Sequence, residues 1–472
     1  MKFFLAGEWH ERDEKIEVRN PFSRDVIDTV PKATNEDVEA ALAAAVSGAQ
    51  TMAAMQGYDR YVILRKAADL MRGRAEDLAQ TISAEEGKTL RESRGEVDRS
   101  VQTMELSGEE AKRLSGELLP LDGGKGTEGK LGFTKRVPCG VVVAITPFNF
   151  PLNLVCHKVG PALAAGNSVI LKPASDTPLV ALKFVEILLD AGLPPLAVSC
   201  ATGSGSIVGN ALCVDRRVRK ISFTGSQEVG ERICKIAGLK RVTMELGSNS
   251  PLIVMPDADM GKVVNATIGN GYANAGQVCI SAQRLIVLDE VHDQVVDALS
   301  PQVESISAGD QLDEATDMGP MVRSQDAERV QNWITEAVDQ GAKLVCGGER
   351  SGAVVQPTLL DNATPDMKVV RDEVFGPTVA VLRASGIDDA IRMANDTNYG
   401  LSAGVFTQDI DAAMKFAKHV HSGNVHINWG PMWRTDLMPY GGLKDSGLGK
   451  EGPKYAIEEM TEMKTIVIHS EP

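Results

Sequence analysis

The sequence lacks the features of several protein classes. Aromatic residues make up 4% of its 472 residues, and no stretch approaches the roughly 18 uninterrupted apolar residues of a membrane-spanning helix. Positive charge is also scarce, because 49 Lys and Arg face 64 Asp and Glu and leave a net charge of −15. Such a surface repels phosphate backbones and anionic lipid, so we expect neither nucleic acid nor a membrane as a partner.

Paired cysteines and metal-binding patterns are missing as well. The seven cysteines are odd in number and scattered, without a Cys-x-x-Cys pair, which argues against a disulfide framework and for a reducing compartment. The opening apolar run ends at Glu8 and is too short for an export signal. The seven histidines form no His-x-x-x-His, so no metal site is predicted. We therefore expect a cytoplasmic protein.

What is present is an ordinary globular composition with an alternating pattern. Hydrophobic residues make up 43% and charged residues 24%, and 472 residues at roughly 150 per domain predict two or three domains. Helical patterns cover 38–55, 59–86 and 90–114. Five strands then follow at 141–145, 168–171, 197–202, 220–223 and 241–245, with helices beginning near 152 and 177 between the first of them. This alternation predicts a parallel sheet and a Rossmann-like dinucleotide domain.

A second α/β pattern follows Pro251. Its predicted strands lie at 252–254, 284–288, 343–346 and 379–382, with helical runs between them, so this half should have its own core. The segment 464–469 is a short terminal strand, of a kind that often pairs across subunits.

Three polar residues in these patterns could carry chemistry. Cys279 in Gly-Gln-Val-Cys could be a thiolate nucleophile, although an isolated cysteine is more often a buried hydrophobe. Glu245 closes an apolar strand, where burial would suit it to act as a general base, but it could equally be a helix cap or an ion-pair partner. Asn149, held between two prolines, could donate to an oxyanion or could be an ordinary turn residue.

Other residues at the predicted strand ends suit a dinucleotide. Lys172 ends the second strand and could bind ribose hydroxyls. The loop after the third strand contains Gly203, Gly205 and Gly209, whose spacing is one residue off the dinucleotide fingerprint. The segment 223–226, Phe-Thr-Gly-Ser, opens a helix whose free N–H groups could hold a pyrophosphate. Each of these residues alone is weak evidence, but all of them lie at or after the ends of consecutive strands of one predicted sheet.

Together these segments resemble the NAD(P)-dependent aldehyde dehydrogenase superfamily. The resemblance rests on motifs that occur in the family's order over some 300 residues: Pro-Phe-Asn-Phe-Pro at 147–151, Lys-Pro at 172–173, Phe-Thr-Gly-Ser at 223–226, Glu-Leu-Gly at 245–247, Gly-Gln-Val-Cys at 276–279, Glu-Val-Phe-Gly-Pro at 373–377 and Pro-Tyr-Gly-Gly at 439–442. Ser248 departs from the second glycine that many members carry, and we expect it to alter only the local turn.

The resemblance implies a mechanism. Cys279 would add to the aldehyde carbon, while Asn149 and the Cys279 backbone N–H stabilise the oxyanion of the thiohemiacetal. Hydride transfer would leave a thioester, which water activated by Glu245 would hydrolyse. Lys172 would bind the adenine-side ribose and Glu373 the nicotinamide ribose.

The resemblance also implies a set of ligand-binding residues and a domain plan. The cofactor site would comprise Ile145, Thr146, Pro147, Phe148, Lys172, Ser175, Gly205, Gly209, Phe223, Gly225, Ser226, Leu246, Glu373 and Phe375. The aldehyde tunnel would be lined by Phe150, Asn153, His157, Ala273, Val278, Ile280, Arg434 and Tyr440. Residues 1–118 with 139–245 would bind NAD(P), 246–453 would form the catalytic domain, and 119–138 with 454–472 would form an oligomerisation ribbon of a dimer or tetramer.

The polar tunnel suggests a small hydroxylated or anionic aldehyde as substrate. Arg434 could bind a substrate carboxylate or hydroxyl, or could pair with an acid such as Asp436. A rival is an acylating enzyme that passes the acyl group of the thioester to coenzyme A. Acylating members of the family lack the glutamate base, whereas Glu245 is present in this sequence. A rival of another class is a catalytically inactive structural relative, which tends to lose one of the groups that remain here.

Cofactor preference is predicted from Ser175. NAD-preferring members often have Glu at this position, whose charge repels a 2′-phosphate, whereas Ser removes the repulsion and can donate a hydrogen bond. We therefore expect NADP to be accepted and preferred, with NAD also usable. The alternative is that Ser175 only caps the helix predicted near 177.

Overall fold

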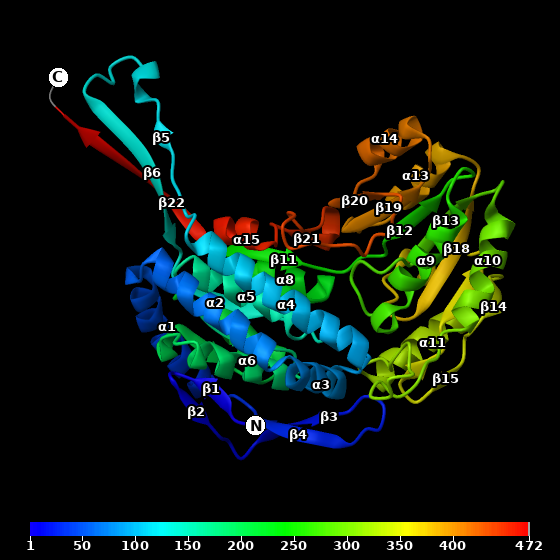
Figure 1. The fold of residues 1–472 in the computed structure, drawn as a ribbon, viewed down its shortest axis with the longest axis horizontal. Helices are drawn as coiled ribbons and strands as arrows, with labels where there is room; N and C mark the ends of the chain where they lie inside the picture. Colours follow the sequence, from blue (N-terminus) through cyan, green and yellow to red (C-terminus); the bar gives the residue numbers. More distant parts are fainter. Residues whose placement is uncertain (471–472) are drawn as a thin grey trace.

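The computed structural model describes residues 1–470, and the chain forms two large sheets joined by the segment after residue 245 (Figure 1). The first sheet contains, in spatial order, β2 (Glu8–His10), β1 (Phe3–Leu5), β9 (Val198–Cys200), β8 (Ser168–Lys172), β7 (Val141–Ile145), β10 (Val218–Thr224), β11 (Arg241–Glu245) and β21 (Gly447–Leu448). The five strands from β9 to β11 are parallel, and their order along the chain is 3-2-1-4-5, as in a Rossmann sheet. The predicted fold class is confirmed.

Helices bury this sheet on its faces. β7 reads Val-Val-Val-Ala-Ile and is buried at every position, as expected for a parallel strand covered on both sides. Helices α1, α5 and α6 contact strands from β7 to β9, α8 contacts β10 and β11, and α2, α3 and α4 form a further layer over α5 and α6. The bounds are α1 (Asn35–Ala54), α2 (Gly57–Gly73), α3 (Ala75–Glu86), α4 (Leu90–Ala111), α5 (Asn153–Ala164), α6 (Leu179–Asp190), α7 (Asn210–Val214) and α8 (Gln227–Ala237).

The second sheet belongs to the other lobe of the molecule and has a hydrophobic cluster of its own. In spatial order its strands are β14 (Lys343–Cys346), β17 (Thr358–Asp361), β18 (Thr378–Ala384), β13 (Arg284–Leu288), β12 (Pro251–Val254), β19 (Ser402–Phe406) and β20 (Asn424–Ile427), and all but β14 run parallel. Its helices are α9 (Met260–Gly271), α10 (His292–Glu304), α11 (Ser324–Asp339), α12 (Lys368–Arg371), α13 (Ile387–Asn395) and α14 (Ile410–His419).

A three-stranded ribbon projects away from both lobes near the C-terminus (Figure 1). It consists of β5 (Leu118–Leu119), β6 (Lys130–Pro138) and β22 (Thr461–His469), with β22 paired to β6 along its whole length. Helix α15 (Pro453–Glu459) connects it to the body and packs on α4 and α5. Two small hairpins complete the chain: β3 (Lys15–Arg19) with β4 (Val26–Pro31), and β15 (Arg350–Ser351) with β16 (Val354–Val355). No helix within residues 1–470 is long and apolar enough to cross a bilayer.

The structure differs from the sequence prediction at several places. The single helix predicted over 59–86 is two helices that meet at Arg74, where Gly73 weakens the helix and Arg74 has φ −114°. The segment 205–209, predicted as a loop, is a short helical turn that runs into α7. Strands β17, β19, β20 and β21 were not predicted.

Candidate active site

The parallel strands of the first sheet deliver the predicted site residues to one edge. Asn149 follows β7, Lys172 ends β8 and Glu245 ends β11, at the carboxyl edge where open α/β sheets bind ligands. A cavity of about 390 Å³ lies at this edge, next to residues of the second lobe. Of the predicted residues, it is lined by Pro147, Phe148, Asn149, Phe150, Asn153, Gly225, Ser226, Glu245, Leu246, Val278, Cys279, Ile280, Glu373, Phe375, Arg434 and Tyr440.

A left-handed turn carries Cys279 into this cavity. Asn274, Ala275 and Gly276 have φ of +51°, +52° and +68°, a conformation that costs non-glycine residues roughly 1–2 kcal/mol each. At Gly276 a Cβ would lie 2.0 Å from the Gly376 carbonyl oxygen, so only glycine permits this close approach. The nucleophile loop is therefore fixed against the segment that carries Glu373 and Phe375.

The Cys279 side chain is half-buried and opens into the cavity. Its Sγ lies 3.5 Å from the Tyr440 hydroxyl, which can donate to the sulfur. Burial raises the pKa of Cys279 to about 12, and nearby Glu245 and Glu373 add to the rise, while the Tyr440 contact opposes it. The resting side chain is consequently a thiol, which must lose its proton to a neighbouring base before or as it attacks.

Glu245 is a buried carboxyl group without a hydrogen-bond partner. Both of its oxygens are unsatisfied, and the residue is 2% exposed. Burial and the charge of Glu451 raise the pKa of Glu245 well above its usual range, against the opposing effect of Arg434 and Lys158. A Cβ at Gly441 would lie 2.7 Å from the Gly449 carbonyl oxygen and 2.8 Å from Glu245 Oε1, so the close backbone contact requires glycine in the Pro-Tyr-Gly-Gly turn and leaves room for this carboxyl.

The Asn149 amide is oriented from the other lobe. One N–H of its Nδ2 donates to the Gln277 carbonyl at 2.7 Å, two residues before Cys279. An amide NH₂ has two donors, so one N–H stays available for a ligand. The Asn149 carboxamide and the Cys279 loop are thus directly connected.

A buried charge network lies beside Glu245 and Tyr440. The Arg434 guanidinium stacks on the Tyr440 ring at 3.8 Å and pairs with Glu451 at 3.3 Å rather than with Asp436, the acid suggested by the sequence. His157 does not line the cavity; it lies behind Arg434, with Nε2 3.1 Å from Asp436 and 3.2 Å from Arg434 Nη2.

Several residues predicted for the cofactor lie around the cavity's other end. Phe148 and Phe375 pack edge to face at 5.9 Å, and Glu373 Oε1 accepts the Ser248 N–H at 2.9 Å. Burial raises the pKa of Glu373 to about 7. Ile145, Thr146, Lys172, Ser175, Gly205, Gly209 and Phe223 do not line the cavity itself.

Lys172 and Ser175 lie at the neighbouring strand end. Lys172 is buried and its Nζ donates to the Pro173 carbonyl at 2.9 Å, and burial lowers the pKa of Lys172 to about 8. Ser175 donates to the Gly203 carbonyl at 3.2 Å. It does not cap the next helix, because α6 begins at 179 and the Glu85 carboxylate accepts its first N–H groups.

Sequence reasoning missed residues that come from distant helices or from loops without a motif. Those lining the cavity include Arg99, Arg323, Arg329, Met432 and Glu451. Arg99 belongs to α4, and the packing of the helices decides which face of α4 lines the cavity. Ala273, also expected in the tunnel, lies in the turn before Cys279 and outside the cavity lining.

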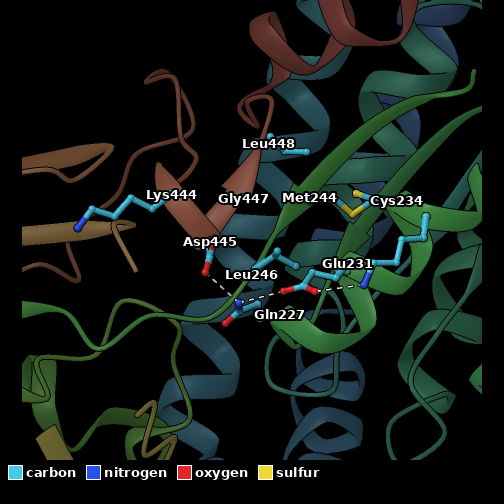
Figure 2. Close-up of a pocket in the computed structure, with 11 residues that line it drawn as sticks. Gln227, Glu231, Cys234, Met244, Leu246, Lys444, Asp445, Gly447 and Leu448 are labelled. Atoms are coloured by element: carbon cyan, nitrogen blue, oxygen red, sulfur yellow. Dashed lines mark hydrogen bonds and ion pairs between the residues drawn. The ribbon is translucent and has the colours of Figure 1, made fainter. Parts of the chain in front are cut away.

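A second depression of about 460 Å³ is lined by residues of α8, of the end of β11 and of the segment 444–448 (Figure 2). Gln227, on α8, donates to Asp445 at 3.0 Å and to Glu231 at 3.1 Å across its rim. Its wall also includes Met244 and Leu246. Because its polar groups bind one another and none of the predicted catalytic residues lines it, the first cavity is the candidate active site. Within residues 1–470 no cluster of three potential metal ligands exists.

The comparisons with known proteins identify the family. The sequence model of the aldehyde dehydrogenase family matches residues 9–466. The 3-sulfolactaldehyde dehydrogenase of Priestia aryabhattai is 48% identical over 466 residues, which cover 99% of this chain and 97% of that protein. The chain therefore belongs to the aldehyde dehydrogenase family and is an oxidoreductase that uses NAD or NADP.

Solved structures agree with this assignment. Aldehyde dehydrogenase 21 from Physcomitrella patens, in complex with the reaction product succinate, has a TM-score of 0.97 and 39% identity, and covers 99% of this chain and 98% of that one. The glyceraldehyde-3-phosphate dehydrogenase of Methanocaldococcus jannaschii, complexed with NADP, has a TM-score of 0.94 and 38% identity, and covers 97% and 100%.

Proposed function

We propose that Cys279, Asn149 and Glu245 together oxidise an aldehyde through a covalent thioester. The observation that carries this proposal is that all three line one cavity, in which Glu245 has no partner and Asn149 keeps one free N–H. The Cys279 thiol gives up its proton to water in the cavity as its sulfur bonds to the aldehyde carbon, and the carbonyl oxygen becomes an oxyanion that accepts from Asn149 and from the Cys279 backbone N–H.

Glu245 is the proton acceptor of this scheme. It takes a proton from water, whose oxygen attacks the thioester carbon and releases the acid and the Cys279 sulfur. Its raised pKa makes it a stronger base than an exposed carboxylate, and its lack of a partner leaves both oxygens available. Tyr440 donates to the sulfur and stabilises it when it is a leaving group.

The strand ends suit the dinucleotide that the family uses. Lys172 has three N–H donors, and within residues 1–470 its Nζ donates only to the Pro173 carbonyl, so the other donors can bind ribose hydroxyls. Gly225 and Ser226 precede α8, whose first N–H groups suit a pyrophosphate, and Glu373 can bind the second ribose. When bound, the cofactor supplies the hydride acceptor.

The substrate we propose is a small aldehyde with an anionic or hydroxylated tail. Arg99 and Arg434 line the cavity on the side of Tyr440, and Arg99 contacts Asp436 at 3.5 Å, which leaves most of its five donors free. The 3-sulfolactaldehyde of the Priestia relative and the succinate of the Physcomitrella complex both have such a tail.

The domain plan and assembly follow the same proposal. Residues 1–118 and 139–245 would bind NAD(P), 246–453 would supply the nucleophile, and 119–138 with 454–472 would join copies into a dimer or tetramer. The ribbon exposes Leu118, Leu131 and Met463 by 74%, 50% and 55%, as expected of a surface that a second copy covers. All seven cysteines are unpaired, in keeping with the cytoplasm.

Replacing Glu245 by Gln should separate the two half-reactions. We expect a stoichiometric burst of reduced cofactor followed by steady-state turnover about 100-fold slower than wild type, because the thioester waits for unactivated water. Wild-type steady-state turnover should rise with pH as Glu245 ionises through its raised pKa, and the variant should lose this rise. Stopped-flow absorbance measures both phases.

Cys279→Ala is the matched control for that experiment and should show no burst while still binding cofactor. Equal loss of burst and steady state in Glu245→Gln would contradict the assignment of the base. If coenzyme A accelerated wild-type turnover and acyl-coenzyme A formed faster than free acid, the acylating reaction would be the correct one.

Replacing Arg99 by Gln should weaken the binding of anionic aldehydes more than the binding of uncharged ones. Loss of a charge-assisted hydrogen bond worth about 1.5–3 kcal/mol should raise KM for succinate semialdehyde about 10- to 100-fold, with KM for propanal changed less than about twofold. Arg323→Gln changes an arginine that also lines the cavity but pairs with Asp176 and stacks on Phe148, and it is the control when both variants are assayed with saturating cofactor. A uniform effect of the Arg99 variant on both aldehydes would refute the anion-binding role.

Replacing Ser175 by Glu should shift cofactor preference toward NAD. Ser175 lines an open depression whose wall includes three arginines, Arg19, Arg24 and Arg323, and three acidic residues, Glu17, Glu85 and Asp176. A further carboxylate at position 175 would therefore make this wall repel a 2′-phosphate. We expect wild type to prefer NADP, and the variant to lose about 100-fold in kcat/KM for NADP but little for NAD. Ser175→Ala is the control without added charge. A wild-type enzyme strongly selective for NAD would refute this reading of Ser175.

A further inference from the structure

A buried ion pair contacts the loop between β7 and α5 that carries Asn149. Lys88, 1% exposed, donates from Nζ to Glu96 at 2.7 Å and to the Asn149 carbonyl at 2.7 Å, and the same ammonium lies 3.8 Å from the centre of the Phe150 ring. Glu96 uses its other oxygen to accept the backbone N–H groups of residues 152 and 153, each at 2.9 Å. One ion pair therefore anchors the carbonyl of Asn149 and the start of α5.

A second set of contacts ties this loop to the nucleophile turn. Asn274, the first residue of the left-handed turn, donates from Nδ2 to the Asn149 carbonyl at 3.1 Å and to Glu86 at 2.9 Å. Its backbone N–H donates to Glu92 at 2.7 Å. The Asn149 carbonyl thus accepts from Lys88 and from Asn274 at once, and it is the point where the two loops meet.

These contacts constrain a conformation that the chain would not adopt unaided. Non-glycine residues in the left-handed region persist where the surroundings over-determine them, and such strain concentrates at functional sites. Glu86 ends α3, Glu92 lies in the first turn of α4, and Lys88 lies in the short link between the two helices, so the helical layer outside the sheet sets the geometry of both loops.

We propose that Lys88 and Asn274 are positioning residues that set the separation between the Asn149 amide and the Cys279 sulfur. The inference rests on the roles proposed for those two groups. An oxyanion donor acts only when it is aimed at the place where charge develops, and a displacement of about 1 Å can cost on the order of 100-fold in rate. Loss of either contact should therefore lower kcat more than it raises the KM for aldehyde.

The principal variant is Lys88→Met combined with Glu96→Gln. Methionine matches the length of lysine but cannot donate, and glutamine keeps an oxygen for the N–H groups of α5 without leaving a buried charge unpaired. We expect kcat to fall at least about tenfold, with KM for aldehyde within about threefold of wild type. Iodoacetamide should still alkylate Cys279 at close to the wild-type rate.

A double-mutant cycle with Asn149→Ala distinguishes positioning from general stabilisation. If Lys88 acts through Asn149, the Lys88→Met and Glu96→Gln changes should lower kcat less than about twofold once Asn149 is already Ala. If the losses multiply instead, Lys88 does not act through Asn149 and the proposal is overturned. If Asn149→Ala alone leaves kcat unchanged, it is the proposed oxyanion role that fails, and this outcome also removes the basis of the positioning proposal.

Two further variants test whether misfolding, rather than loss of positioning, explains a lower kcat. Asn274→Gly removes the side chain but tolerates the left-handed backbone, and it should show the same dependence on Asn149. Lys220→Met removes another fully buried lysine, which bonds Thr243 far along β10 from the site, and should leave kcat within about twofold. Equal kcat losses in the Lys220 and Lys88 variants would show that any buried lysine matters alike, and would refute the proposal.

Discussion

The compensation of buried charge at the junction of the two lobes is the constraint on which the site depends. Lys88 is matched by Glu96, and Lys158 and Arg434 are matched by Glu451, all within 3.3 Å. Glu245 alone among the charged residues of this cavity has two unsatisfied buried oxygens. A fold that pairs the surrounding charges and leaves one carboxyl unpaired retains a group that binds protons strongly where a base is needed.

Backbone geometry also holds the catalytic groups in place. Glycine is required at Gly276, where the nucleophile turn touches the Gly376 carbonyl, and at Gly441, where the turn after Tyr440 touches the Gly449 carbonyl beside Glu245. Both glycines belong to motifs that could be read from the sequence, and the structure supplies the steric reason for them. The catalytic groups are consequently held by close backbone contacts as well as by hydrogen bonds.

Sequence reasoning located the parts of the site that follow strand ends. The alternation of buried strands and helices predicted the parallel sheet, and a parallel sheet brings Asn149, Lys172 and Glu245 to one edge. It could not locate Arg99, which reaches the cavity from the helical layer, or Lys88, which contacts the Asn149 carbonyl from the same layer, because their orientation depends on how helices pack. The family resemblance placed His157 in the tunnel, but the helix turns it behind Arg434.

The central claim is that substrate becomes covalently attached to Cys279, and mass spectrometry of the enzyme quenched in acid during turnover tests it most directly. The account predicts an acyl group, with the mass of the product acid less water, on the peptide that contains Cys279, and its accumulation when Glu245 is replaced by Gln. Turnover with no acylated cysteine, or with the acyl group on one of the other six cysteines, would contradict it.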